Sequence, residues 1–114
     1  MSETTRTWQD ICPIEDIVPN AGRCALVKGE QIAIFRVKQS GNDAFFAIEN
    51  HDPFSRANVL ARGIVGSVAE KTVVASPIYK QHFCLETGVC LEDEDASVKT
   101  YPIKVEDGRI FLPA

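Results

Sequence analysis

Frequent turn-forming residues divide the chain into short apolar segments, and no stretch keeps a 3.6-residue apolar period over the length of a helix. These segments are rich in β-branched residues and predict strands at residues 8–12, 22–27, 31–37, 44–48, 64–68, 71–76, 82–85, 98–105 and 109–112. Asp107-Gly108 predicts a hairpin between the last two, because this pair readily adopts positive φ. We therefore predict an all-β fold of the sandwich or barrel type.

Two segments between the predicted strands show no periodicity. Residues 13–20 are bracketed by Pro13 and Pro19, which leaves room for a turn or a single helical turn. Residues 49–62 are typical of an irregular loop. One domain covering residues 1–114 is expected, because two domains of half this length would each bury too little core.

Charge and hydropathy exclude two classes of partner. The chain has 12 basic and 16 acidic side chains, a net charge of −4, and no Lys/Arg cluster that would neutralise a phosphate backbone, so nucleic acid is not an expected partner. Its apolar runs fall far short of the roughly 20 residues that cross a bilayer. Residues 1–7 have neither the basic start nor the apolar stretch of a secretory leader. We expect a cytoplasmic protein without membrane contact.

The four cysteines, Cys12, Cys24, Cys84 and Cys90, allow either disulfides or a metal site. A reducing cytosol disfavours disulfides. Cys12, Cys24 and Cys84 lie in apolar predicted strands, where a cysteine typically behaves as a small buried hydrophobe. Cys84 and Cys90 lack the C-x-x-C spacing of a zinc knuckle. We predict four free thiols.

Two loops carry the main functional signal. Residues 50–54 read Asn-His-Asp-Pro-Phe, and residues 76–83 read Ser-Pro-Ile-Tyr-Lys-Gln-His-Phe and lead into the Thr87-Gly88 turn. This pattern resembles the Rieske ferredoxin family, whose cluster loops read C-P-H and C-P-x-H. The resemblance covers most of the chain. It implies an all-β Rieske-like (ISP-type) sandwich or barrel, with a smaller loop-bearing subdomain inserted at approximately residues 49–88.

The resemblance places the wrong residues at the four cluster positions. A Rieske [2Fe–2S] centre needs two thiolates on one iron and two imidazoles on the other. The corresponding positions here are Asp52, Phe54, Ser76 and Tyr79. A phenyl ring has no donor atom, and hydroxyl groups match thiolate and imidazole poorly. We therefore predict no cofactor, no metal and no catalytic residue in this chain.

An atypical site remains an alternative. His51, Asp52, His82 and Cys84 lie in or near the two loops, and together they would make an electron-transfer ferredoxin with unusual ligands. In the other interpretation, His51 is a solvated loop residue and His82 is a satisfied polar group at the start of a strand. A binding module unrelated to redox chemistry is a third possibility.

Longer stretches narrow the resemblance to one family. Residues 50–55, 59–66, 74–83 and 87–94 look like the small subunit of the assimilatory NAD(P)H-dependent nitrite reductase. Membership implies a large-subunit partner that carries FAD, sirohaem and iron–sulfur clusters and reduces nitrite to ammonia. It also implies a docking or stabilising role for this chain.

Two roles are open for the loop side chains. By analogy with true Rieske domains, the partner contact would comprise six residues, Pro53, Phe54, Arg56, Ile78, Tyr79 and Lys80. Alternatively, Phe54 and Tyr79 fold inward and fill the volume of the absent cluster, because protein interiors do not tolerate voids. The acidic run 92–95 is another candidate contact, although such runs are usually solvated surface.

Overall fold

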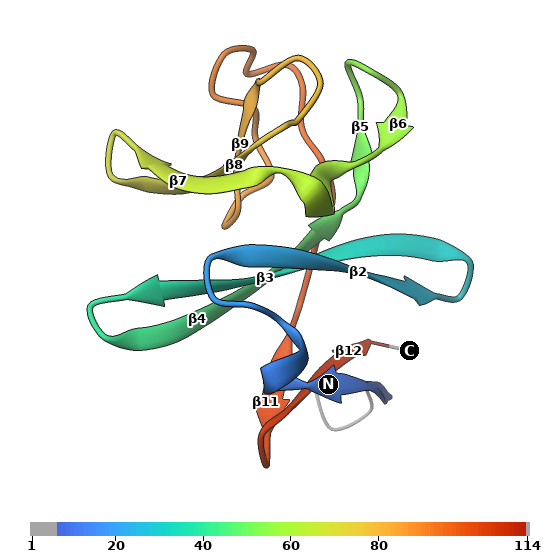
Figure 1. The fold of residues 1–114 in the computed structure, drawn as a ribbon. Coiled ribbons are helices and arrows are strands. Elements are labelled where there is room, and N and C mark those ends of the chain that lie inside the picture. The colour runs from blue at the N-terminus through green and yellow to red at the C-terminus, as the bar shows by residue number, and fades with distance from the viewer. Residues whose placement is uncertain (1–6, 114) are drawn as a thin grey trace.

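A computed structural model describes residues 7–113 as a stack of three β-layers (Figure 1). The strands are β1 (Trp8–Pro13), β2 (Ala21–Val27), β3 (Glu30–Gln39), β4 (Asn42–Glu49), β5 (His51–Asp52), β6 (Ala57–Asn58), β7 (Ile64–Val68), β8 (Lys71–Ala75), β9 (His82–Cys84), β10 (Thr100–Tyr101), β11 (Lys104–Glu106) and β12 (Arg109–Pro113). Two 3₁₀ turns, η2 (Ile14–Asp16) and η3 (Leu60–Arg62), complete the elements. The prediction of an all-β chain is confirmed.

The middle layer is a four-stranded antiparallel sheet in the order β10-β4-β3-β2. Its strand β3 is buried on both faces, and successive side chains point to opposite sides. Ala33 and Phe35 belong to the core shared with the upper layer, whereas Ile32 and Ile34 belong to the core shared with the lower layer. Strand β3 is therefore the wall between two hydrophobic cores.

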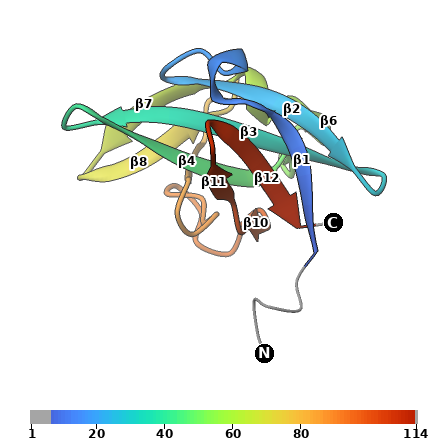
Figure 2. The same ribbon diagram turned by 90° about the horizontal axis from the view of Figure 1, so that it is seen from below.

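The lower layer joins the two ends of the described chain. Strand β12 pairs with both β1 and β11, and Trp8 lies opposite Pro113. Asp107 and Gly108 both have positive φ in the turn between β11 and β12, as the sequence predicts. Figure 2, which shows the molecule from below, places this layer against the middle sheet. Both described ends therefore lie on the side of the molecule opposite the upper loops (Figure 1).

The upper layer contains the β5–β6 hairpin and the antiparallel sheet β7-β8-β9. Residues 49–62 were expected to be irregular, but they include β5, β6 and the 3₁₀ turn η3. Tertiary contacts create this order: the Ala61 N–H donates to Asn50 Oδ1 at 2.7 Å across the segment, and Leu60 is fully buried in the upper core. Such contacts leave no periodic signal in the sequence.

The predicted strand at 98–105 is two strands in two different sheets. Thr100–Tyr101 pairs with β4 in the middle layer, whereas Lys104–Glu106 pairs with β12 in the lower layer. Pro102 stands between them and has no backbone N–H to give to a ladder, so the pairing is interrupted there. The prediction of one continuous strand is therefore wrong, and the reason is a single proline.

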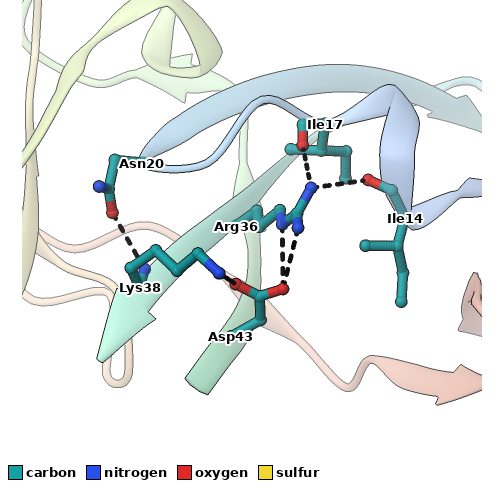
Figure 3. Close-up of polar contacts among 6 residues, drawn as sticks. All are labelled: Ile14, Ile17, Asn20, Arg36, Lys38 and Asp43. Atoms are coloured by element: carbon teal, nitrogen blue, oxygen red, sulfur yellow. Dashed lines mark hydrogen bonds and ion pairs between the residues drawn. The ribbon is translucent and has the colours of Figure 1, made fainter. Parts of the chain in front are cut away.

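A half-buried arginine connects the N-terminal turn to the middle sheet (Figure 3). Arg36 Nη1 donates to the carbonyl oxygen of Ile17 at 3.0 Å, and Arg36 Nε and Nη2 both donate to Asp43 Oδ2, at 3.2 and 3.0 Å. These hydrogen bonds, with those from Lys38, hold the pKa of Asp43 below its usual value. The backbone N–H of Lys38 also donates to Asn20 Oδ1 at 3.0 Å. This network fixes η2, the single helical turn that the sequence allows at 13–20.

All four cysteines are free, as predicted, but they do not share one environment. Cys12, Cys84 and Cys90 are buried, whereas Cys24 is exposed. The expectation that Cys24 is a buried hydrophobe is wrong, because β2 is an edge strand of the middle sheet with solvent beside it.

Residues 7–113 contain no helix long and apolar enough to cross a membrane. Residues 1–6, on which the prediction about a leader rests, lie outside the described part of the chain.

Candidate functional site: two matched turns in place of a cluster

The two signal loops fold into turns of the same design. We call residues 52–56 the Asp52 turn and residues 76–80 the Ser76 turn. In the first, the Arg56 N–H donates to the Asp52 carbonyl oxygen at 2.7 Å; in the second, the Lys80 N–H donates to the Ser76 carbonyl oxygen at 3.1 Å. Arg56 and Lys80 close their turns in the left-handed region, at φ 63° and 68°.

The first side chain of each turn also accepts a hydrogen bond from the backbone. The Phe54 N–H donates to Asp52 Oδ1 at 2.9 Å, and the Ile78 N–H donates to Ser76 Oγ at 3.3 Å. Short polar side chains commonly cap the backbone two residues ahead in this way, and the proline that follows presets φ for a turn. The sequence pattern acceptor-Pro-x-x-basic therefore builds both turns locally.

A buried hydrogen bond joins the two turns. The Ser76 hydroxyl donates to Asp52 Oδ2 at 2.5 Å, and both side chains are 0% exposed. Burial by itself raises the pKa of Asp52, but the hydrogen bonds from Ser76 and from the backbone of Phe54 and Ser55 outweigh it, so the pKa is lowered. Asp52 is thus a buried carboxylate held in its charged form by several donors.

The remaining two cluster positions have opposite environments. Phe54 packs against the upper core, its ring centroid 6.2 Å from that of Phe83. Tyr79 is 60% exposed, and its neighbour Ile78 is 45% exposed. The expectation that both rings fold inward is correct for Phe54 and wrong for Tyr79. Phe83 and Phe54 already pack in this core, and an inward Tyr79 would need a partner for its hydroxyl among apolar side chains.

The histidines make separate polar contacts. His51 Nδ1 lies 3.1 Å from Asn58 Oδ1 on the neighbouring strand β6. His82 Nδ1 lies 2.6 Å from Glu92 Oε2, and its backbone N–H donates to Glu92 Oε1 at 2.8 Å. Within residues 7–113, no three His, Cys, Asp or Glu side chains are grouped so that they could hold a metal ion. The structure therefore does not bring the atypical ligand set together.

The donor set does not fit a [2Fe–2S] cluster. A cluster would have to lie between the two turns, where Asp52 Oδ2 and Ser76 Oγ are already in hydrogen-bond contact. At the two positions that correspond to histidines in a Rieske domain, the phenyl ring of Phe54 points into the core and the phenol of Tyr79 points to solvent. Thiolate and imidazole are the ligands that such a centre requires, and neither stands here.

The residues proposed for a partner contact divide into two groups. Arg56, Ile78, Tyr79 and Lys80 are exposed on the two turns, whereas Pro53 and Phe54 are half-buried. Sequence reasoning missed the partner of His82: Glu92 belongs to the acidic run, which was interpreted as solvated surface. It also missed the match between the turns, although the spacing of Asp-Pro-x-x-Arg and Ser-Pro-x-x-Lys is legible in the sequence.

Comparisons with known proteins identify the family of this chain. Residues 7–113 match the family described as Rieske-like [2Fe-2S] domain. The nitrite reductase (NADH) small subunit of Salmonella typhimurium is 51% identical over 105 residues, which cover 92% of this chain and 95% of the relative. The chain belongs to this Rieske-like family of nitrite reductase small subunits. Its predicted family resemblance is therefore confirmed.

Two further relatives of the small-subunit family are informative. The solved structure of the Escherichia coli protein NirD superimposes with a TM-score of 0.86 at 46% identity, covering 96% of this chain and 98% of that one. A nitrite reductase [NAD(P)H] large subunit of Klebsiella oxytoca is 37% identical over 108 residues, which are 95% of this chain but only 11% of that protein. In that relative, a segment similar to the small subunit is part of the large chain.

Proposed function

We propose that this chain is a non-catalytic subunit of a cytoplasmic NAD(P)H-dependent nitrite reductase and acts as a docking or stabilising partner of the large subunit. The absence of a redox role is supported by the hydrogen bond between Asp52 and Ser76, two of the four residues that correspond to cluster ligands in the Rieske pattern. FAD, sirohaem and iron–sulfur clusters belong to the large subunit in this proposal. The whole chain, 1–114, acts as one domain, with 49–88 as its loop-bearing subdomain.

The Klebsiella oxytoca relative supports the choice of partner. A domain that is fused to another domain meets it at a high effective concentration, so even a weak contact between them stays occupied. A separate small subunit must replace the tether with a contact surface of its own. The described ends of this chain lie opposite the two turns, so a tether there would leave the turns free (Figure 1).

The two turns offer the contact surface. Ile78 and Tyr79 are exposed at their tip, and aromatic side chains with an apolar body and a polar end are typical anchors of protein interfaces. The turns need no ligand to be ordered, because the backbone hydrogen bonds and the Asp52–Ser76 contact hold them. A preformed surface loses little entropy on binding.

Reconstitution tests this proposal. Nitrite reduction and complex formation by the large subunit are measured with and without this chain, and with the variants Ile78→Ala and Tyr79→Ala. We expect the chain to bind and to stabilise the large subunit, and each variant to weaken binding about tenfold, as truncated interface anchors do.

Leu26→Ala is the matched control, because Leu26 is a 68% exposed apolar residue on β2 in the middle layer. Equal effects of Leu26→Ala and Tyr79→Ala would contradict the docking surface. Iron and visible absorbance in the purified, folded chain would contradict the absence of a cluster.

A further inference from the structure

Six of the eleven basic side chains in residues 7–113 form ion pairs, and two of the five that do not lie at the two turns. Six Lys or Arg side chains form ion pairs with carboxylates: Arg23, Arg36, Lys38, Lys99, Lys104 and Arg109. Within residues 7–113, neither Arg56 nor Lys80 has a carboxylate at ion-pair distance, and the Lys80 ammonium contacts only the Pro77 carbonyl oxygen, at 3.2 Å. Lys28, Arg62 and Lys71 also have no carboxylate partner in the described residues, so what distinguishes Arg56 and Lys80 is their matched positions in the two turns.

The positions of these two charges are equivalent. Each is the fifth residue of its turn, adopts positive φ and donates its N–H back to the first residue. The first residues, Asp52 and Ser76, are bonded to each other in the buried core of the tip. The backbone therefore holds the two residues in equivalent positions, each at the end of a turn that begins at one partner of this hydrogen bond.

From this arrangement we infer that Arg56 and Lys80 form a two-point cationic contact for an acidic surface of the large subunit. This inference rests on the proposed function and adds the charge of the partner's face. Exposed charges of one sign accelerate association with a surface of the opposite sign and fix the orientation of docking. Ile78 and Tyr79 lie between Pro77 and Lys80 on the Ser76 turn, so the charged contact adjoins the apolar one.

Charge complementarity favours an acidic surface of the large subunit over a second copy of this chain as the partner of this face. A symmetric contact between two copies of this face would bring four like charges together, and like charges at an interface oppose association. The acidic run is adjacent rather than part of the face: Glu92 is held by His82, and none of the carboxylates at 92–95 pairs with Arg56 or Lys80 in the described structure.

The test is charge reversal, with binding to the intact large subunit measured at low and high salt. The variant Arg56→Glu with Lys80→Glu is compared with Lys28→Glu. Lys28 is a close control, because it is exposed, has a φ of 52° and lies in the turn between β2 and β3 of the middle layer. Circular dichroism and melting temperature establish that each variant folds, and Arg56→Gln with Lys80→Gln replaces the reversal if it does not.

We expect the reversed variant to associate at least about tenfold more slowly at low salt, and this difference to shrink at high salt. Lys28→Glu should behave like the unmodified chain. Equal effects of the two variants, or no effect of reversal while Tyr79→Ala weakens binding, would overturn the cationic contact and leave the proposed function intact.

Other outcomes would assign the contact to a different surface or a different partner. If Asp93→Lys with Glu94→Lys weakens binding and reversal at the turns does not, the contact face is the acidic run and the inference is wrong. If the chain self-associates and reversal at the turns abolishes this, the face belongs to a second copy. If no variant changes binding, or no complex forms, both the inference and the docking proposal are overturned.

Discussion

The Asp52 turn and the Ser76 turn have the same backbone hydrogen bonds but use their third and fourth residues differently. Phe54 of the first packs into the upper core against Phe83, whereas Ile78 and Tyr79 of the second remain exposed. One turn therefore closes the interior and the other presents apolar surface. The difference teaches that two turns with the same backbone design can fill the interior from one side only, which leaves the side chains of the other turn exposed.

The largest expected effect comes from breaking the bond between the turns. Asp52→Ala removes the acceptor of the Ser76 hydroxyl and of the Phe54 N–H, and buried donors left without partners are costly. We expect the free energy of unfolding to fall by about 3 kcal/mol, measured by urea denaturation at pH 7. Asp95→Ala, at an exposed carboxylate, is the control and should change it by less than about 0.5 kcal/mol. A small effect of Asp52→Ala would mean that the two turns are held by other contacts.

The contrast between Phe54 and Tyr79 is the next test. Phe54→Ala should lower the free energy of unfolding by about 2 kcal/mol, because a half-buried ring leaves the core. Tyr79→Ala should cost less than about 0.5 kcal/mol, as expected for an exposed side chain. Thermal and urea unfolding of both variants measure this difference. Similar losses for both would contradict the opposite orientations of the two rings.

The smallest effect is a change in the pH dependence of stability. The folded pKa of Asp52 is lowered, so its contribution to stability is complete above the unfolded value of about 4 and is lost as pH falls through the folded pKa. Asp52→Asn removes this titration. The difference in unfolding free energy between the unmodified chain and Asp52→Asn should therefore be constant from pH 7 to 5 and shrink below about pH 4. A difference that is the same at pH 3 and pH 7 would show that Asp52 is not held charged.

Much of the fold could be predicted because its signals are local. The strand periods at 31–37 and 44–48, the Asp107-Gly108 hairpin and the confinement of 13–20 between prolines each depend on a few neighbouring residues. The prediction of a single strand at 98–105 was wrong for a local reason, because Pro102 has no backbone N–H and interrupts the pairing. The order in 49–62 could not be predicted, because it comes from a non-periodic side-chain contact between Ala61 and Asn50 and from the packing of Leu60 against other elements of the upper core.

The candidate site shows the same division. The absence of cluster ligands at residues 52, 54, 76 and 79 is a matter of side-chain chemistry, and the sequence alone determined it. Only the tertiary structure decided that Asp52 bonds to Ser76, that Phe54 turns inward and that Tyr79 turns outward. Residue identity limits which bonds a side chain can make. Which of those bonds form depends on what the folded chain places beside it. Here Phe54 of the first turn and Val74 of β8, which leads into the second, pack in the same upper core.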